Sequence, residues 1–211
     1  MSPIKALIFD FGGVLVRTED WSGRRKWEAQ LGLAERMLDQ TVFNSDTAAR
    51  ASRGELPASD VWAYVASTLK LDAAQLEACR TDFWAGDKLD VELIALIQSL
   101  RPRYQTAILS NAWSDARENF ARLFGLDKAF DTLIISAEEG VAKPDPRLYQ
   151  IAVERLGVRP HAAVFVDDFI ENIEAARAVG LRAIHYQPGL DVRAALEQLG
   201  VVAPAAGQAP A

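Results

Sequence analysis

The segment KALIFDFGGVL, residues 5–15, decides the fold prediction for this chain. Its apolar first half is typical of a strand that is buried on both faces of a parallel sheet. The run ends at Asp10, which is followed by Phe11 and two glycines. Glycine permits a positive φ and lets the backbone approach a ligand closely, so this strand end is a candidate ligand site.

Four more apolar runs, rich in β-branched residues, alternate with helical patterns further along the chain. We expect Ser114 to be the N-cap and Gly125 the end of one such helix, and Pro146 to lie in the first turn of the next. Alternating strands and helices predict an α/β fold, a Rossmann-like doubly wound parallel sheet. The five expected strands are residues 4–9, 105–110, 132–136, 162–167 and 181–186.

About 100 residues separate the first two strands, where a simple crossover unit needs roughly 30. The excess contains helical patterns, no convincing strand and four of the five tryptophans. We therefore predict a helical cap inserted after strand 1, with most of its aromatic residues forming a small core. Trp21 is the best candidate for a substrate contact. The expected organisation is a core of 1–16 and 88–200, a cap of 17–87 and a flexible tail of 201–211.

Composition and charge narrow the classes of partner. The net charge of −6 argues against a nucleic-acid surface, and we interpret the run Arg24–Lys26 as a solvated helix face. No apolar stretch approaches the roughly 20 residues of a membrane span, and we expect no membrane partner. The single cysteine, Cys79, is expected in a helix core and suits a reducing compartment. With no apparent signal segment, a cytoplasmic location is expected; a homodimer is possible.

Chemically useful side chains follow the ends of the first four predicted strands. The carboxyl ends of parallel strands lie along one edge of a sheet, so these side chains are expected to converge. A turn residue is the ordinary explanation for any one of them, but the set in this order favours a site. Its members are Asp10, Ser110, Asn111, Lys143, Asp167 and Asp168.

This set suits phosphoryl transfer. Asp10 can attack phosphorus and form an aspartyl-phosphate, and Lys143 can hold the phosphoryl group and Asp10. The hydroxyl of Ser110 and the amide of Asn111 can donate to phosphoryl oxygens. Three carboxylates so close together need a cation, and hard oxygen ligands suit Mg²⁺.

Four short motifs resemble those of the haloacid dehalogenase superfamily, in chain order FDFGGVL, ILSNA, AKPDPRLY and VFVDDFIENI. The resemblance extends from strand 1 to about residue 186. It implies a Rossmann-like core, a helical cap and Mg²⁺-dependent hydrolysis of a small phosphorylated metabolite. By position, Asp10 is the nucleophile, Gly12 gives its carbonyl to the metal, Asp168 binds it directly and Asp167 binds it through water. Ser110, Asn111 and Lys143 hold the phosphate, and Asn172 lies at the usual downstream position.

Gly12 departs from that pattern, because phosphatases of the superfamily usually have a second aspartate there as general acid and base. A phosphatase-like branch that includes the amino-terminal domain of soluble epoxide hydrolases is similar in this respect. General acid–base catalysis is worth about 10²–10⁴-fold, so we expect a slow enzyme, a trapped intermediate, a good leaving group or a substitute acid. Candidate substitutes are Glu19, Asp20 and Asp115.

Two alternative functions stay open at this point. One is 2-haloacid dehalogenation through an ester on Asp10, which needs no metal. The other is a non-catalytic domain that binds a phosphorylated ligand, for which Gly12 is the only support. His161 and His185 are interpreted as structural or exposed, while Trp113 can pack under the cap or line the substrate entrance.

Overall fold

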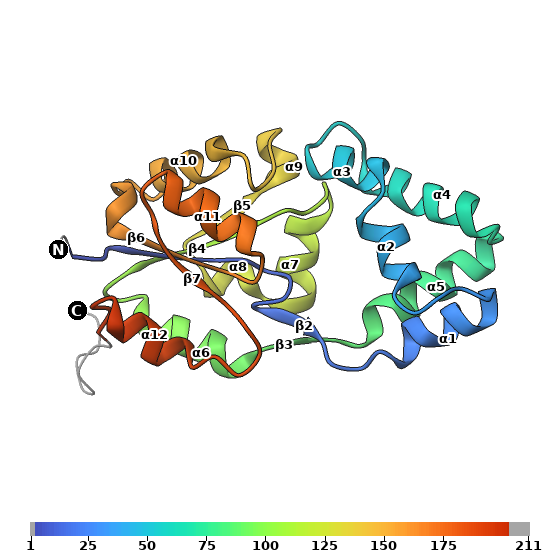
Figure 1. The fold of residues 1–211 in the computed structure, drawn as a ribbon, viewed down its shortest axis with the longest axis horizontal. Helices are drawn as coiled ribbons and strands as arrows, with labels where there is room; N and C mark the ends of the chain where they lie inside the picture. The colour runs from blue at the N-terminus through green and yellow to red at the C-terminus, as the bar shows by residue number, and fades with distance from the viewer. Residues whose placement is uncertain (1–2, 203–211) are drawn as a thin grey trace.

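The structure is a computed structural model, and it describes residues 3–202. Two lobes are joined by a narrow connection: a core that contains the sheet and a helical cap (Figure 1). Most of the predicted tail, from residue 203, lies outside the described residues. Within the described chain, no helix has the length and apolar character required to cross a membrane.

The core is built on a five-stranded sheet of order β5-β4-β1-β6-β7, in which every neighbouring pair is parallel. β1, the strand of the opening motif, is the central strand, so its carboxyl end is flanked by those of β4 and β6. The α/β prediction is confirmed, with each predicted strand present and up to two residues shorter. The strands are β1 (Ala6–Phe9), β4 (Gln105–Ser110), β5 (Thr132–Ile135), β6 (Ala163–Asp167) and β7 (Arg182–His185).

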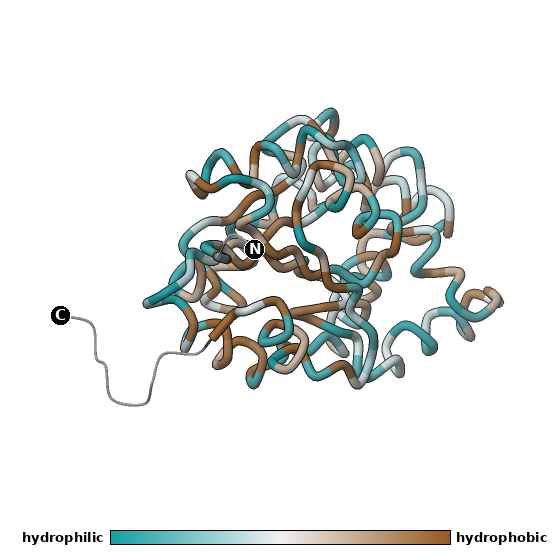
Figure 2. Tube along the Cα trace, turned by 60° about the vertical axis from the view of Figure 1, so that its left-hand side comes forward, coloured by the Kyte–Doolittle hydropathy of each residue, from teal (hydrophilic) through white to brown (hydrophobic). Residues whose placement is uncertain are grey.

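Helices cover both faces of this sheet, and the apolar strand sequences follow from that burial. Leu7 and Phe9 pack into one apolar cluster and Ala6 and Ile8 into the other, so alternate residues of β1 face opposite layers. Figure 2 shows the resulting hydrophobic centre of the core. The core helices are α6 (Val91–Leu100), α7 (Ala116–Phe124), α8 (Leu126–Ala129), α9 (Ser136–Glu139), α10 (Pro146–Arg155), α11 (Ile170–Ala178) and α12 (Val192–Gln198), with a 3₁₀ turn, η1 (Pro160–Ala162).

The cap has a small apolar core of its own. Trp27, Trp62 and Phe83 pack together there with Cys79, which is fully buried as predicted. Burial raises the pKa of the Cys79 thiol to about 11, which argues against a nucleophilic role. The cap helices are α1 (Ser22–Leu31), α2 (Met37–Phe43), α3 (Asp46–Ser52), α4 (Ala58–Leu69) and α5 (Ala73–Ala85).

Two short strands connect the lobes, where the sequence suggested none. β2 (Val16–Thr18) and β3 (Asp87–Leu89) pair antiparallel, so the chain enters and leaves the cap side by side. Arg17 secures this connection to the core, because its guanidinium donates to Asp90 at 2.8 Å and to the Tyr186 hydroxyl at 2.9 Å.

Two local predictions need correction. Arg25 and Lys26 are exposed as expected, but Arg24 is not on the solvated face: it is 4 % exposed, and its guanidinium pairs with Asp39 and Asp87. Ser114 is not the cap of α7, which begins after Asp115. The Ser114 hydroxyl instead accepts a hydrogen bond from the Ala58 backbone N–H at the start of α4. Both residues bind groups that lie far away in the sequence, which local patterns do not reveal.

The cap touches the core on the side of α9. α3 packs against α9, and a Cβ added to Gly54 would lie 2.1 Å from the Ala137 carbonyl oxygen. Trp113, in the loop after β4, packs against both apolar clusters of the cap. This answers the open question about Trp113 in part, because its ring lies beneath the cap.

Candidate active site

The structure brings the predicted strand ends together. Asp10 follows β1, Ser110 ends β4 and Asp167 ends β6, and these three strands are adjacent in the sheet. Lys143 reaches the same point from the loop between α9 and α10. All four residues are at most 6 % exposed. A buried cluster of ionisable groups at this edge of an α/β sheet is characteristic of a functional site.

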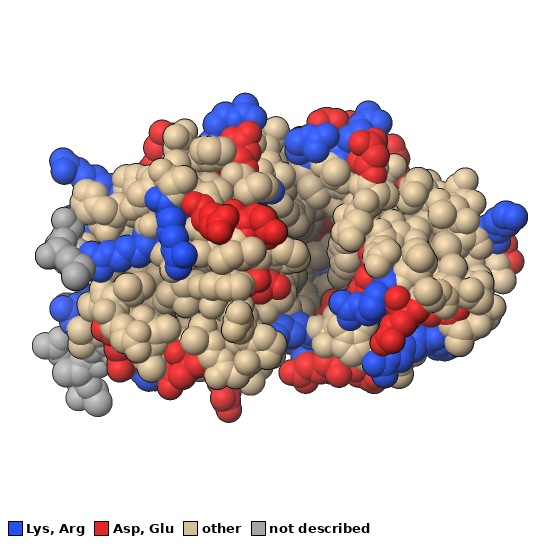
Figure 3. Space-filling view, in the orientation of Figure 1, with Lys and Arg blue, Asp and Glu red and all other residues tan. Residues whose placement is uncertain are grey.

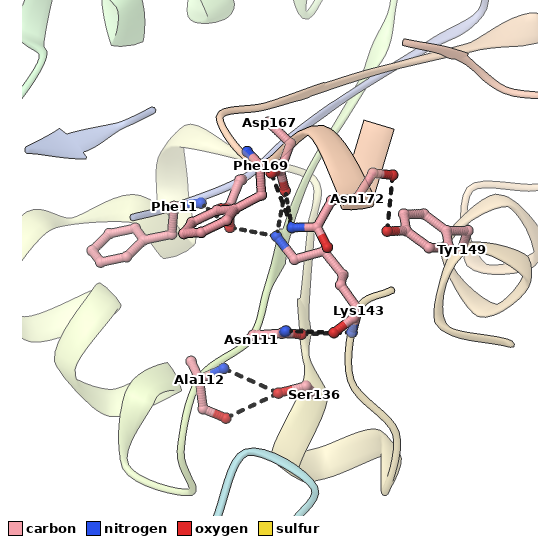
Figure 4. A network of polar contacts seen from close by, with 10 residues as sticks. Phe11, Asn111, Ala112, Ser136, Lys143, Tyr149, Asp167, Phe169 and Asn172 are labelled. Carbon is pink, nitrogen blue, oxygen red and sulfur yellow. Dashed lines mark hydrogen bonds and ion pairs between the residues drawn. The ribbon is translucent and has the colours of Figure 1, made fainter. Parts of the chain in front are cut away.

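Lys143 bridges two carboxylates at the centre of the site (Figure 4). Its Nζ lies 2.7 Å from Asp10 Oδ1 and 2.7 Å from Asp167 Oδ2. Asp10 Oδ1 also accepts the backbone N–H of Phe11, at 2.7 Å. Both contacts fall on one oxygen of Asp10, which leaves Oδ2 as the oxygen that can face a substrate.

Asp167 is held by partners on both of its oxygens. Oδ1 accepts the backbone N–H of Phe169 at 2.8 Å, and the Asn172 side-chain amide donates to both oxygens at 3.0 and 3.1 Å. The backbone carbonyl of Asn172 accepts in turn from the Tyr149 hydroxyl, at 3.1 Å. The Asp167 side chain is thus fixed by protein groups and holds Lys143 in place.

Asp168 has the opposite character. Its Oδ1 is buried and has no hydrogen-bond partner among the described residues, which is costly unless a ligand binds it. Oxygens of Asp10, Asp167 and Asp168 lie within 4.8 Å of one another. Three hard oxygen donors, one of them unsatisfied, fit a divalent cation of the Mg²⁺ type. His185 Nε2 lies 3.0 Å from the backbone carbonyl of Asp168, in a contact that positions this residue.

Burial and mutual repulsion shape the charges of the cluster. Burial raises the pKa of Asp10 to about 7; Asp167 adds to this, whereas Lys143 lowers it. The pKa of Asp168 is also raised, by burial and by Asp167. Burial alone would lower the pKa of Lys143, but its two carboxylate partners outweigh that effect and raise it. Lys143 therefore stays charged, and the site carries more carboxylate than it can neutralise.

The two glycines after Asp10 have different roles. Gly13 has a φ of +78°, and a Cβ there would lie 2.1 Å from Asp168 Oδ2, so glycine is required for Asp168 to approach. Gly12 does not have a positive φ, and no atom lies within 4 Å of its would-be Cβ. The positive φ expected of these glycines is therefore found at Gly13, where the close neighbour is the Asp168 carboxylate, while Gly12 faces open space beside the nucleophile candidate.

The loop after β4 is fastened to the Lys143 loop. The Asn111 side chain donates to the Lys143 carbonyl at 2.8 Å and accepts the Lys143 N–H at 2.7 Å. Ser136 similarly binds both backbone groups of Ala112. Sequence reasoning missed this use of the Asn111 side chain, and it missed Ser136 and Tyr149 altogether. The polar Ser136 at the end of an apolar strand was the available signal.

The candidate substitutes for a general acid are placed at the entrance to the cap and before α7. The Asp20 carboxylate accepts the Ser22 N–H at 2.8 Å, and the Glu19 and Asp20 amides both donate to the Gly86 carbonyl. Asp115 precedes α7. Among the hydrogen bonds and ion pairs of the described residues, none joins these three carboxylates to Asp10.

This geometry agrees with a sequence-family match. The model of the haloacid dehalogenase-like hydrolases matches residues 4–180, which is most of the chain. The chain belongs to this family. The chain is also 26 % identical over 197 residues to the sesquiterpene phosphatase astK of Aspergillus oryzae, and the match covers 92 % of this chain and 96 % of that protein.

Two other proteins are similar to this chain. Bifunctional epoxide hydrolase 2 of Rattus norvegicus is 35 % identical over 100 residues, which cover 46 % of this chain and only 18 % of that longer protein. Among solved structures, the HAD-family enzyme BT-2542 of Bacteroides thetaiotaomicron, in complex with magnesium and inorganic phosphate, superposes with a TM-score of 0.75 at 18 % identity. That match covers 91 % of this chain and 98 % of BT-2542, and it establishes a shared fold.

Proposed function

We propose that this hydrolase is a Mg²⁺-dependent phosphatase that acts on a small phosphorylated metabolite through an aspartyl-phosphate on Asp10. The observation that carries the proposal is the excess of carboxylate at one point. Asp10, Asp167 and Asp168 meet there around a single lysine, and Asp168 Oδ1 is buried without a partner. Such a cluster suits a cation and a phosphoryl group together.

Each residue then has a defined role. Asp10 Oδ2 forms a bond to phosphorus, the bond from phosphorus to the leaving-group oxygen breaks, and that oxygen keeps the electron pair. Water then attacks the same phosphorus and frees the Asp10 carboxylate and phosphate. Lys143 neutralises charge on the phosphoryl group. The Ser110 hydroxyl and the backbone amide of Asn111 donate hydrogen bonds to that group.

Asp10, Asp168 and the Gly12 carbonyl would hold the metal directly, with Asp167 acting through water. Bound Mg²⁺ would neutralise phosphoryl charge and bring two anions, nucleophile and substrate, together. The hydrogen bonds that occupy both oxygens of Asp167 support an indirect role for that residue. The names of the relatives add support, because one is a phosphatase and BT-2542 binds magnesium and phosphate.

Dehalogenation is less compatible with this site. A haloacid reaction needs no metal and leaves the buried Asp167 and the half-buried Asp168 without a cation to bind. The orphaned Asp168 oxygen therefore favours phosphoryl transfer.

The decisive experiment is an assay of p-nitrophenyl phosphate and acetyl phosphate hydrolysis with Mg²⁺ and with EDTA, beside Asp10→Asn. We expect metal-dependent turnover that falls at least about a thousandfold in the variant, as for other covalent nucleophiles. Thermal melting of Asp10→Asn verifies that it is folded. Undiminished turnover in the variant contradicts the mechanism, and chloride release from 2-chloropropionate in EDTA favours the dehalogenase instead.

A further inference from the structure

Three aromatic side chains form a continuous surface between the loop after β4 and the cap, named here the aromatic wall: Trp113, Phe43 and Trp84. The ring centroids of Trp113 and Phe43 are 6.0 Å apart, and those of Phe43 and Trp84 are 5.9 Å apart. Phe43 ends α2, and Trp84 lies in the last turn of α5. Three distant parts of the chain therefore contribute to one surface.

The wall starts at the catalytic end of the core. Trp113 is three residues beyond Ser110, in the loop that Asn111 and Ser136 fasten in place. From there the rings lead to the cap, and Figure 3 shows a hollow between core and cap. A group attached to a phosphate at Asp10 would thus lead toward this surface.

The wall is left partly open by the cap. The exposed fractions are 45 % for Phe43 and 40 % for Trp84, although the cap has an apolar core nearby. Large apolar side chains that are grouped and exposed commonly mark a binding surface. Here the two rings are joined through Trp113 to the loop that begins at the Ser110 end of β4.

One buried charge near the wall, that of Arg24, is already paired. Arg24 lies under the Phe83 ring with its guanidinium carbon 4.0 Å from the ring centroid, but Asp39 and Asp87 bind its nitrogens. At the core end, Gly12 provides open space and no polar side chain. Neither feature is suited to reading the hydroxyls of a sugar or the charges of an amino acid.

We propose that the aromatic wall binds an apolar leaving group, so that the preferred substrates are phosphate esters with a hydrocarbon portion of several carbons. This inference rests on the proposed phosphatase function and specifies its substrate class. The hydrocarbon packs on Phe43 and Trp84 while the phosphoryl group reaches Asp10. The bonds made and broken are those given above, and the released alcohol or phenol takes its proton from water.

The test uses a series of 4-alkylphenyl phosphates, from methyl to heptyl. The acidity of the leaving phenol is nearly constant along this series, so only the apolar area changes. A fully buried methylene is worth about fourfold in binding, and against a one-sided wall we expect kcat/KM to rise roughly two- to fourfold per carbon before it levels off. A flat or falling series overturns the inference.

Variants of the wall residues test whether the dependence on chain length arises at the aromatic wall. Phe43→Ser and Trp84→Ser should each flatten the chain-length slope, and Phe43→Leu should retain most of it. Tyr64→Ser is the matched control: Tyr64 is 38 % exposed on α4, and in residues 3–202 it has no ring contact with the wall. An unchanged slope in both serine variants contradicts the assignment, as does an equal loss in the Tyr64 control.

Hydrolysis of acetyl phosphate, which has no long hydrocarbon, distinguishes the phosphatase activity from the apolar subsite. Hydrolysis of acetyl phosphate together with a flat alkyl series removes the apolar subsite and leaves the phosphatase intact. Failure to hydrolyse acetyl phosphate and every aryl phosphate, with Mg²⁺ present, overturns the phosphatase function and this inference with it.

Discussion

The two sides of the cleft are built from different kinds of side chain. On the core side, ionisable groups are buried and tightly held: Lys143 binds two carboxylates, and Asp167 accepts hydrogen bonds on both oxygens. On the cap side, Phe43 and Trp84 are partly exposed, and their contacts are ring packing. Directional contacts fix the position of reacting atoms, whereas ring packing tolerates variation in shape. The core side thus suits chemistry and the cap side suits substrate choice.

Removal of the Lys143 charge should have the largest effect on stability. Lys143→Met leaves Asp10 and Asp167 buried without a counterion, and we expect about 3–5 kcal/mol of lost stability at neutral pH. Turnover should fall about 10²–10³-fold, because a donor to the phosphoryl group is lost. Urea unfolding and initial rates measure the two effects. Wild-type stability in Lys143→Met would show that the bridge is not what holds the core side together.

Introduction of an acid at Gly12, on the core side, should raise turnover. Gly12 lacks a positive φ and has open space around its would-be Cβ, so Gly12→Asp introduces a carboxyl group without a clash. We expect turnover of poor leaving groups to rise roughly ten- to a hundredfold, below the full range for a positioned acid. The rise should be smaller for acetyl phosphate.

The isosteric control for that experiment is Gly12→Asn, whose side-chain amide is not acidic enough to protonate a leaving group. An equal gain in both variants would assign the effect to shape rather than acid catalysis. If wild-type rates are independent of leaving-group pKa across a series of aryl phosphates, then another residue of the wild-type enzyme already acts as the general acid.

Metal binding should depend steeply on pH if the core side is a magnesium site. Asp10, with its pKa raised to about 7, and Asp168, with a raised pKa, must both lose protons before they bind a cation. In metal-free protein, a raised carboxyl pKa means that the folded state binds more protons than the unfolded state. Stability contributed by Asp10 is therefore lost as pH rises from about 4 to about 7.

Added Mg²⁺ should restore that loss, with up to about a tenfold gain in affinity per pH unit for each proton released, below pH 7. Thermal shifts measured with and without Mg²⁺ at pH 5 and pH 8 test this. A shift of equal size at both values contradicts a carboxylate site of this kind.

The smallest expected effect concerns the contact between the cap and the core, where α3 packs against α9. Gly54→Ala places a Cβ 2.1 Å from the Ala137 carbonyl oxygen and should push the cap away from α9. We expect a several-fold rise in KM for long alkylphenyl phosphates. Gly140→Ala is the control, because its φ of +69° is nearly the same as the +71° of Gly54, but no atom lies near its would-be Cβ. Equal KM values in the two variants would show that the position of the cap does not affect substrate binding.

The core side was far more predictable from sequence than the cap side. Buried parallel strands are continuous apolar runs, and Asp10, Ser110 and Asp167 are polar residues that end such runs. Their convergence then follows from topology. Arg24 was misread because its partners, Asp39 and Asp87, lie 15 and 63 residues away. The aromatic wall likewise combines residues from three separate segments, and no local pattern shows which rings remain exposed.

The short pairing of β2 with β3 affects how this chain can be modified. Thr18 lies opposite Asp87 and Val16 opposite Leu89, so the cap starts and stops at one place on the core. A tight turn that joins these two strands could therefore bridge the gap left by excision of the whole cap. The cap is a cassette in this sense, replaceable by one from another hydrolase while the catalytic framework keeps its own connections.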